Sequence, residues 1–189
     1  EVSRMKKNVW VVIILLVAVV LVLISRTERR ERPEPEKILP TEEKGASVTL
    51  YFPNLEYIRT GNEELPRLLP VEREIKSENG DLEERVLQEL RQPPPDEEEM
   101  TSGIRENLTI IDVRREGGLV YVDFSSQNLY GGSLEERLLI EQVTMTLTGL
   151  AGVEGVQFLV DGEKRESLMG HIGTERPLGR EDLLPAPST

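Results

Sequence analysis

An unbroken apolar run from Val9 to Ile24 constrains this chain more than any other feature of its sequence. As a helix the run would measure about 24 Å, slightly less than the ~30 Å hydrocarbon core of a bilayer. Trp10 and two arginines after the run, Arg26 and Arg29, can reach the membrane interfaces and extend such a span. The sequence therefore predicts an N-terminal transmembrane anchor over residues 1–25. A cleaved signal peptide is the alternative, although the letters SRTERR follow the run where a small-residue cleavage site would stand.

Basic residues stand on both sides of the apolar run, so their distribution does not decide which end lies in the cytoplasm. The segment before the run is short, as in signal anchors that export everything after them. We expect a single-pass protein of the cell membrane whose remaining part lies outside the cytoplasm.

A charged, proline-containing segment follows the anchor. Pro33, Pro35 and Pro40 and the scarcity of apolar side chains predict an extended, solvated linker over residues 26–46. The whole chain has a net charge of −12, and because residues 1–32 hold seven basic and three acidic residues, the remainder carries −16. A domain this acidic disfavours nucleic acid and anionic membrane surfaces as partners.

Hydrophobic periodicity beyond the linker predicts the element order β-β-α-β-β-α-β. The predicted elements are strands at Ser47–Phe52 and Leu68–Ile75, a helix from the N-cap Asp81 to the prolines at 93–95, a hairpin turning at Gly117-Gly118, a helix from Ser133, and a strand at Gly155–Val160. The fold class is α+β (an α/β sandwich), with a small mixed sheet and two helices packed on one face. We expect the domain to occupy residues 47–176 and a flexible tail to follow over residues 177–189.

The predicted core comes from three apolar sets. They are Val120, Val122 and Phe124 in one strand, Val156, Phe158 and Val160 in another, and Ile140, Val143 and Leu147 on the second helix. Ser133 is expected to cap that helix, with Glu136 at capping-box spacing. Thr144, Thr146 and Thr148 are small enough to let the helix lie close to a sheet, or they form a hydrogen-bonding surface.

Motifs for chemistry are missing from the sequence. No glycine-rich nucleotide loop follows a strand, and no nucleophile elbow is present. The only histidine, His171, could join Ser125 or Ser126 and Asp123 or Asp161 in a triad, but their spacing does not support one. The acidic run from Asp96 to Glu99 lacks the alternate-residue pattern of a calcium loop. The chain has no cysteine, and we expect no catalytic residue, cofactor or metal.

One face of the second predicted helix is a candidate surface for protein contacts. Arg137, Glu141, Thr144 and Thr148 repeat there at helical spacing, away from the apolar stripe.

Six segments in series resemble the GerMN domain family of sporulation and spore-germination proteins. They read VTLYFPN, LLPVEREI, VLQELRQPPP, LTIIDVRREGGLVYVDFSSQ, LIEQVTMTLTGLAGVEGVQFLVDGE and GHIG, and together they cover roughly Ser47 to Arg176. The resemblance implies a non-enzymatic, extracytoplasmic domain with a fold like the ring-building motif. It also implies partners among sporulation-complex or envelope proteins, and a second copy of the chain is a further candidate.

This sequence departs from the family in two ways. It has an apolar anchor where relatives have a lipidated cysteine, and it has room for one such domain, not a tandem pair. Two other functions stay open from the residues themselves. One is an envelope ligand-binding or sensory domain, and the other is a cell-wall hydrolase that uses paired carboxylates.

Overall fold

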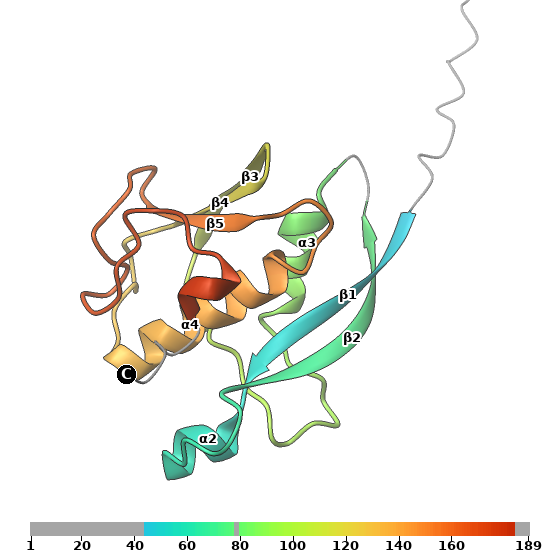
Figure 1. Ribbon diagram of the computed structural model, residues 1–189, viewed down its shortest axis with the longest axis vertical. Coiled ribbons are helices and arrows are strands. Elements are labelled where there is room, and N and C mark those ends of the chain that lie inside the picture. Colours follow the sequence, from blue (N-terminus) through green and yellow to red (C-terminus); the bar gives the residue numbers. More distant parts are fainter. Residues whose placement is uncertain (1–43, 78–79, 184–189) are drawn as a thin grey trace, which may run out of the picture. The chain divides into compact units, whose positions relative to one another are not determined.

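The computed structural model describes residues 44–77 and 80–183 (Figure 1). The predicted anchor and nearly all of the predicted linker lie outside these residues. Within the described ranges, no helix has the length and apolar character that crossing a membrane requires. The α+β class is confirmed, with strands in two small sheets and helices between and beside them.

The first sheet is an antiparallel pair. β1 (Lys44–Pro53) pairs with β2 (Leu68–Ser77) in a register that sets Leu50 opposite Val71. A short helix that the sequence analysis missed, α2 (Leu55–Thr60), stands between them. The side-chain oxygen of Asn54 accepts hydrogen bonds from the first turn of α2, and Gly61 ends it at φ +64°.

The second sheet is mixed, as predicted. β3 (Ile110–Glu116) and β4 (Leu119–Phe124) form an antiparallel hairpin, and β5 (Gly155–Val160) lies parallel to β4. A parallel neighbour needs a crossover connection, which α4 (Ser133–Leu147) supplies. The strand positions match the prediction closely, but they form two sheets where one was expected.

The helix α4 explains why the strands form two sheets where one was expected. It lies between the two sheets and packs on β1 from one side and on β5 from the other (Figure 1). Apolar and small residues cover most of its surface, so covering one face alone would leave the rest exposed. Thr144 and Thr146 are fully buried, and the Thr146 hydroxyl accepts a 3.1 Å hydrogen bond from the N–H of Tyr51 in β1. These threonines therefore let the helix approach the sheet.

The predicted core is confirmed. Every residue of its three apolar sets is buried, with at most 1% of its surface exposed. The other predicted helix, α3 (Leu82–Glu89), adds Val86 and Leu87 to the same core and ends before the prolines. Asp81 does precede α3, but its carboxylate pairs with Arg85 at 3.0 Å and makes no capping hydrogen bond.

The cap of α4 lies one residue earlier than predicted. Gly132 is the N-cap, and its N–H donates to the Glu135 carboxylate at 2.7 Å. Ser133 is the first residue of the helix. Glu136, which the capping-box spacing had assigned to this role, is completely buried and faces another segment. Gly132 takes the extended backbone conformation of an N-cap (φ −83°, ψ 173°), so the capping contact falls one residue earlier than the spacing from Ser133 predicts.

The segment after Pro177 is folded as far as the structure describes it. The N–H and C=O of Leu178 both bond to Val156 of β5 at 2.9 Å, and residues Arg180–Leu183 form a 3-10 helix, η1. Arg180 donates to the carbonyl of Met145 in α4 at 2.9 Å. Our expectation of a loose tail from residue 177 is thus corrected up to Leu183, because Leu178 is an apolar anchor for this segment.

Candidate functional site

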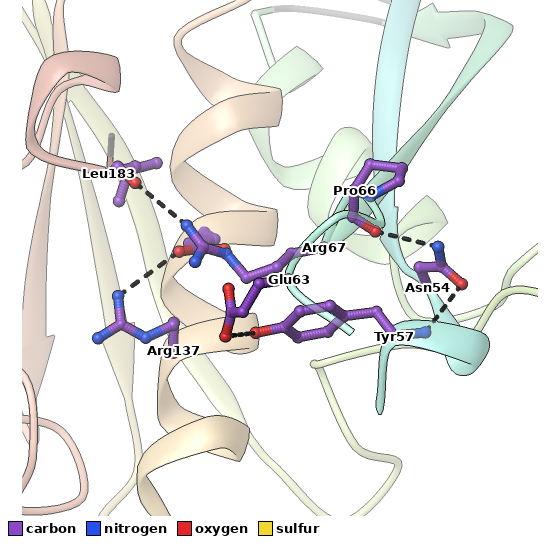
Figure 2. Close-up of polar contacts among 8 residues, drawn as sticks. Asn54, Tyr57, Glu63, Pro66, Arg67, Arg137 and Leu183 are labelled. Atoms are coloured by element: carbon purple, nitrogen blue, oxygen red, sulfur yellow. Dashed lines mark hydrogen bonds and ion pairs between the residues drawn. The ribbon is translucent and has the colours of Figure 1, made fainter. Parts of the chain in front are cut away.

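A charged cluster of Arg67, Arg137 and Glu141 lies at the middle of α4 (Figure 2). Arg67 donates from Nε to Glu141 Oε2 at 3.0 Å and from a terminal nitrogen to the carbonyl of Leu183 at 3.4 Å. Arg137, one helical turn before Glu141, lies 3.7 Å from its other oxygen, Oε1. Arg67 therefore joins three segments far apart in the sequence: its own, the carboxylate of α4 and the C-terminal segment at Leu183.

The position of Arg67 is set by the buried side chain of Asn54. The Asn54 amide donates to the carbonyl of Pro66 at 3.0 Å, and its backbone N–H donates to the carbonyl of Arg67 at 2.9 Å. The same side chain caps α2, so one residue fixes both the helix and the start of β2. Figure 2 also shows Tyr57 of α2 reaching toward Glu63, to which its hydroxyl donates at 3.4 Å.

Burial dominates the electrostatics of Glu141. Only 4% of the residue is exposed, and loss of hydration raises the pKa of its carboxyl above the ordinary value, against the opposing pull of Arg67 and Arg137. Within the described residues its Oε1 atom is buried without a hydrogen-bond partner, since 3.7 Å to Arg137 is too long for one. The carboxylate thus has one acceptor oxygen that the fold does not satisfy.

A pocket of about 430 Å³ opens beside this cluster. Its walls are apolar on one part and charged on another, with Ile140, Ile172 and Leu183 among the apolar residues. Of its charged residues, Arg176 pairs with Asp182 at 2.5 Å. A pocket with paired charges of both signs and apolar walls is suited to contact with a peptide or a small polar molecule.

The predicted contact face on α4 is only partly accessible. Arg137 is exposed, but Glu141 and Thr144 are buried, which corrects the expectation that all four side chains present themselves to a partner. Thr148 is half-buried, and its hydroxyl accepts a 3.1 Å hydrogen bond from Arg180 of η1. Arg67 and the C-terminal segment cover this face, and no local periodicity reveals such coverage.

The residues considered for a catalytic triad stabilise turns instead. Asp161 accepts a 3.0 Å hydrogen bond from the N–H of Ser126, and hydrogen bonding from Ser126 lowers the pKa of the Asp161 carboxyl. Asp123 accepts from a backbone N–H of the turn after β5 at 3.0 Å. Nε2 of His171 lies 3.2 Å from a backbone carbonyl just before α4. These contacts hold loops at one end of the sheet.

Glu136 is the functional-looking residue that the sequence analysis misassigned. Its two carboxylate oxygens accept three backbone hydrogen bonds of 2.8–2.9 Å from the N–H groups of Leu168, Met169 and His171. A signal was present, since Glu136 stands four residues before Ile140 and so lies on the apolar stripe of α4. An acidic side chain on the apolar stripe indicates a buried carboxylate that accepts hydrogen bonds from another segment, and not a helix cap.

The acidic run from Asp96 to Glu99 is exposed. Its clearest structural contact is through the backbone, where the carbonyl of Glu99 accepts from the N–H of Leu55 at 2.8 Å. Among the described residues, no three histidine or acidic side chains gather closely enough to hold a metal ion.

Residues 49–166 match the model of the Germane family, whose description is "Sporulation and spore germination". No curated protein matches the chain. Several solved structures share the fold. The first GerMN domain of the sporulation protein GerM from Bacillus subtilis is 17% identical with a TM-score of 0.57, and the match covers 72% of this chain and 99% of that one.

Two further structures are similar. The tandem GerMN domains of the same Bacillus subtilis protein are 20% identical with a TM-score of 0.52, over 72% of this chain and 45% of that one. A candidate lipoprotein from Clostridium perfringens is 18% identical with a TM-score of 0.50, over 73% of this chain and 89% of that one. At these identities the structures establish the shared fold.

Proposed function

Because this chain belongs to the Germane family of sporulation and spore-germination domains, we propose that it is a membrane-anchored, extracytoplasmic assembly module. It binds other proteins of a sporulation, germination or cell-envelope complex and is not an enzyme. The family match over residues 49–166 carries this proposal, since it extends from β1 to beyond β5.

The use of the polar groups supports a binding role. Glu136, Asp123 and Asp161 each hold a backbone segment in place, and Asp182 near the pocket is ion-paired with Arg176. A cell-wall hydrolase needs a free acid and a free base on either side of a substrate. Carboxylates already committed to structural contacts are poorly suited to those roles.

The apolar run from Val9 to Ile24 supports anchoring in the membrane, and the candidate lipoprotein among the similar structures is consistent with an envelope location. We propose one membrane helix, followed by a solvated linker that holds the domain outside the cytoplasm.

The accessible part of the α4 face is the surface we propose for partner contact. Arg137 and Thr148 lie on it, Glu141 and Thr144 support it from below, and the pocket opens next to it. Arg137 is exposed and is paired with Glu141 only at 3.7 Å, so it can turn toward a partner at little cost.

The experiment is a crosslinked pull-down of the whole chain from its own cells, vegetative and sporulating separately. Recovery of sporulation-complex proteins only from sporulating cells supports the proposal. Recovery of the same partners in both states narrows the proposal to a general cell-envelope complex and excludes a sporulation-specific one, and recovery of none contradicts it. Arg137→Glu should reduce recovery, whereas Arg59→Glu, at an exposed arginine of α2, should not.

A ligand-binding or sensory role is the second candidate, and the 430 Å³ pocket is the observation that favours it. Thermal unfolding of the whole chain with cell-wall fragments tests this role. A concentration-dependent rise in the unfolding temperature, lost in Arg137→Glu, supports it, and an unchanged temperature argues against it.

A further inference from the structure

The outer edge of β3 is open. β3 stands at the end of the order β3-β4-β5, so its ladder hydrogen bonds go to β4 alone (Figure 1). From Ile111 to Glu116 every residue except Val113 is exposed, and Ile111 leaves 53% of its surface open. Beside it, α3 contacts β3 through the Arg115–Glu83 ion pair at 3.1 Å, and a pocket of about 230 Å³ is lined by α3 and the start of the strand. Strand edges of this kind are templates for another strand.

The hairpin turn determines which backbone groups of β3 are available. A two-residue glycine turn makes Glu116 and Leu119 a hydrogen-bonded pair, and such pairs alternate along an antiparallel ladder. The N–H and C=O groups of Val113 and Arg115 therefore point away from β4. In the described part of the chain, no other backbone segment hydrogen-bonds to them.

The charges on β3 are self-complementary. We propose that a second copy of this chain adds its β3 antiparallel to the first, about a two-fold axis through Val113. In this register Val113 faces Val113 of the second copy and exchanges two hydrogen bonds with it. Asp112 of each copy then faces Arg114 of the other, at positions where cross-strand side chains come closest.

Within one copy the same charges are already held on the exposed face. Arg114 contacts Asp112 at 3.1 Å and Glu116 at 3.0 Å, and its guanidinium lies 4.5 Å from the centre of the Tyr121 ring. Arg114 is thus already ordered by contacts within its own copy, with its guanidinium over Tyr121 of β4, and pairing with a second copy requires the side chain to shift toward the open edge.

Neighbouring registers are disfavoured by like charges. Moving the second strand by two residues in one direction sets Arg114 against Arg114 and Asp112 against Glu116. Moving it by two residues in the other direction sets Asp112 against Asp112. A move by four residues sets Arg115 against Arg115 and, although Arg114 then faces Glu116, it carries Asp112 past the end of the strand and shortens the paired segment. A move by an odd number of residues sets the free N–H and C=O groups of one strand opposite residues whose own groups point toward β4, so no ladder hydrogen bonds form. The charge pattern of β3 therefore favours the pairing centred on Val113, and this self-complementarity points to a second copy of the chain as the added strand.

A single introduced thiol can report this register, because the chain contains no cysteine. At a hydrogen-bonded pair the two Cα atoms lie about 5.5 Å apart, within the range of a disulfide. The whole chain carrying Val113→Cys, oxidised in its membrane, should give a covalent dimer on a non-reducing gel. Asn62→Cys, exposed in the loop after α2, should not. Absence of the Val113→Cys dimer, or equal dimer from both variants, overturns the proposal.

Charge reversal tests the pairing itself. Added to Val113→Cys, either Asp112→Arg or Arg114→Asp should lower the dimer fraction about tenfold, because each creates two like-charge pairs. Co-expression of the two should restore the dimer as a heterodimer, since the two introduced charges then face each other. Both reversals in one chain should restore the homodimer, which controls for folding. Unchanged crosslinking in the single variants, or no recovery in the mixture and the double variant, overturns the proposal.

The second copy does not rest on the assembly role proposed above. If the Val113→Cys dimer forms but the pull-down recovers no partner, only the assembly role is contradicted. If partners are recovered but the dimer does not form, only the dimer is contradicted.

Discussion

The carboxylate of Glu136 accepts a 2.8 Å hydrogen bond from the backbone N–H of His171, 35 residues away in the sequence. Together with the bonds from Leu168 and Met169, this contact fastens the segment after β5 onto the first turns of α4. The segment continues to Leu178, which covers β5. One buried acid therefore fastens residues 168–171 to α4, while Leu178 and Arg180 hold the rest of the C-terminal segment.

Replacing this acid should be costly. Glu136→Gln leaves a donor facing one of the three backbone N–H groups, such as that of His171, and we expect the free energy of unfolding to fall by about 1–3 kcal/mol. Urea unfolding of the whole chain in a mild detergent measures the change. Glu166→Gln, an exposed acid in the same segment, should change stability by less than about 0.5 kcal/mol. Equal effects of the two substitutions would contradict the role of Glu136.

Glu141 should make stability depend on pH in a defined direction. Its pKa is raised in the folded state, so the folded chain retains the proton longer than the unfolded chain does. The free energy of unfolding should therefore fall as pH rises from the ordinary value of 4.5 through the raised pKa. Glu141→Gln does not titrate, so its stability relative to the unmodified chain should increase over that window. An opposite trend would mean that pairing with Arg67 and Arg137 outweighs burial.

Gly103 should tolerate no side chain. A Cβ atom there would lie 2.9 Å from Leu139 Cα and 3.0 Å from the Gln142 side-chain oxygen, which accepts the Gly103 N–H at 2.7 Å. Because the nearest atom is backbone of α4, we expect Gly103→Ala to lower the free energy of unfolding by about 1–3 kcal/mol. Gly173→Ala is the matched control, since its Cβ would have no neighbour nearer than 4.0 Å. Denaturant midpoints of the two variants should separate clearly.

Leu178 should contribute as a core residue. It is 5% exposed, and truncation to alanine should cost about 2–3 kcal/mol of unfolding free energy. Leu134→Ala, at a leucine that is 36% exposed, should cost less than about 1 kcal/mol. Hydrogen exchange provides a second check, because the amides of Leu178 and Val156 should be protected together. Rapid exchange at both would restore our expectation of a loose tail.

Much of the fold could be predicted because its signals are local. Alternation of apolar residues located β3, β4 and β5, and glycine or prolines marked where elements end. The helix α2 has six residues, fewer than two turns, so periodicity could not reveal it. Asn54 before it and Gly61 after it were the available signals.

The candidate site was harder to predict because its contacts are long-range. Arg67 and Glu141 are 74 residues apart, and no spacing rule brings a residue before β2 to the middle of α4. Glu136 was misassigned because its distance from Ser133 fits a cap while its distance from Ile140 fits burial. The face of α4 with Arg137 and Glu141 was predicted to be accessible. Helical periodicity tells which residues share a face, but it does not tell which faces other segments cover.

The C-terminal segment closes the far edge of the three-stranded sheet. The backbone of Leu178 hydrogen-bonds to the N–H and C=O of Val156, and the backbone of Glu163 hydrogen-bonds to those of Val160. The side-chain amide of Gln157 donates to the carbonyl of Phe158. Strand addition is therefore possible only on the β3 side of this sheet. An isologous contact there joins two chains and leaves no growing end, so the sheet cannot propagate into a fibre.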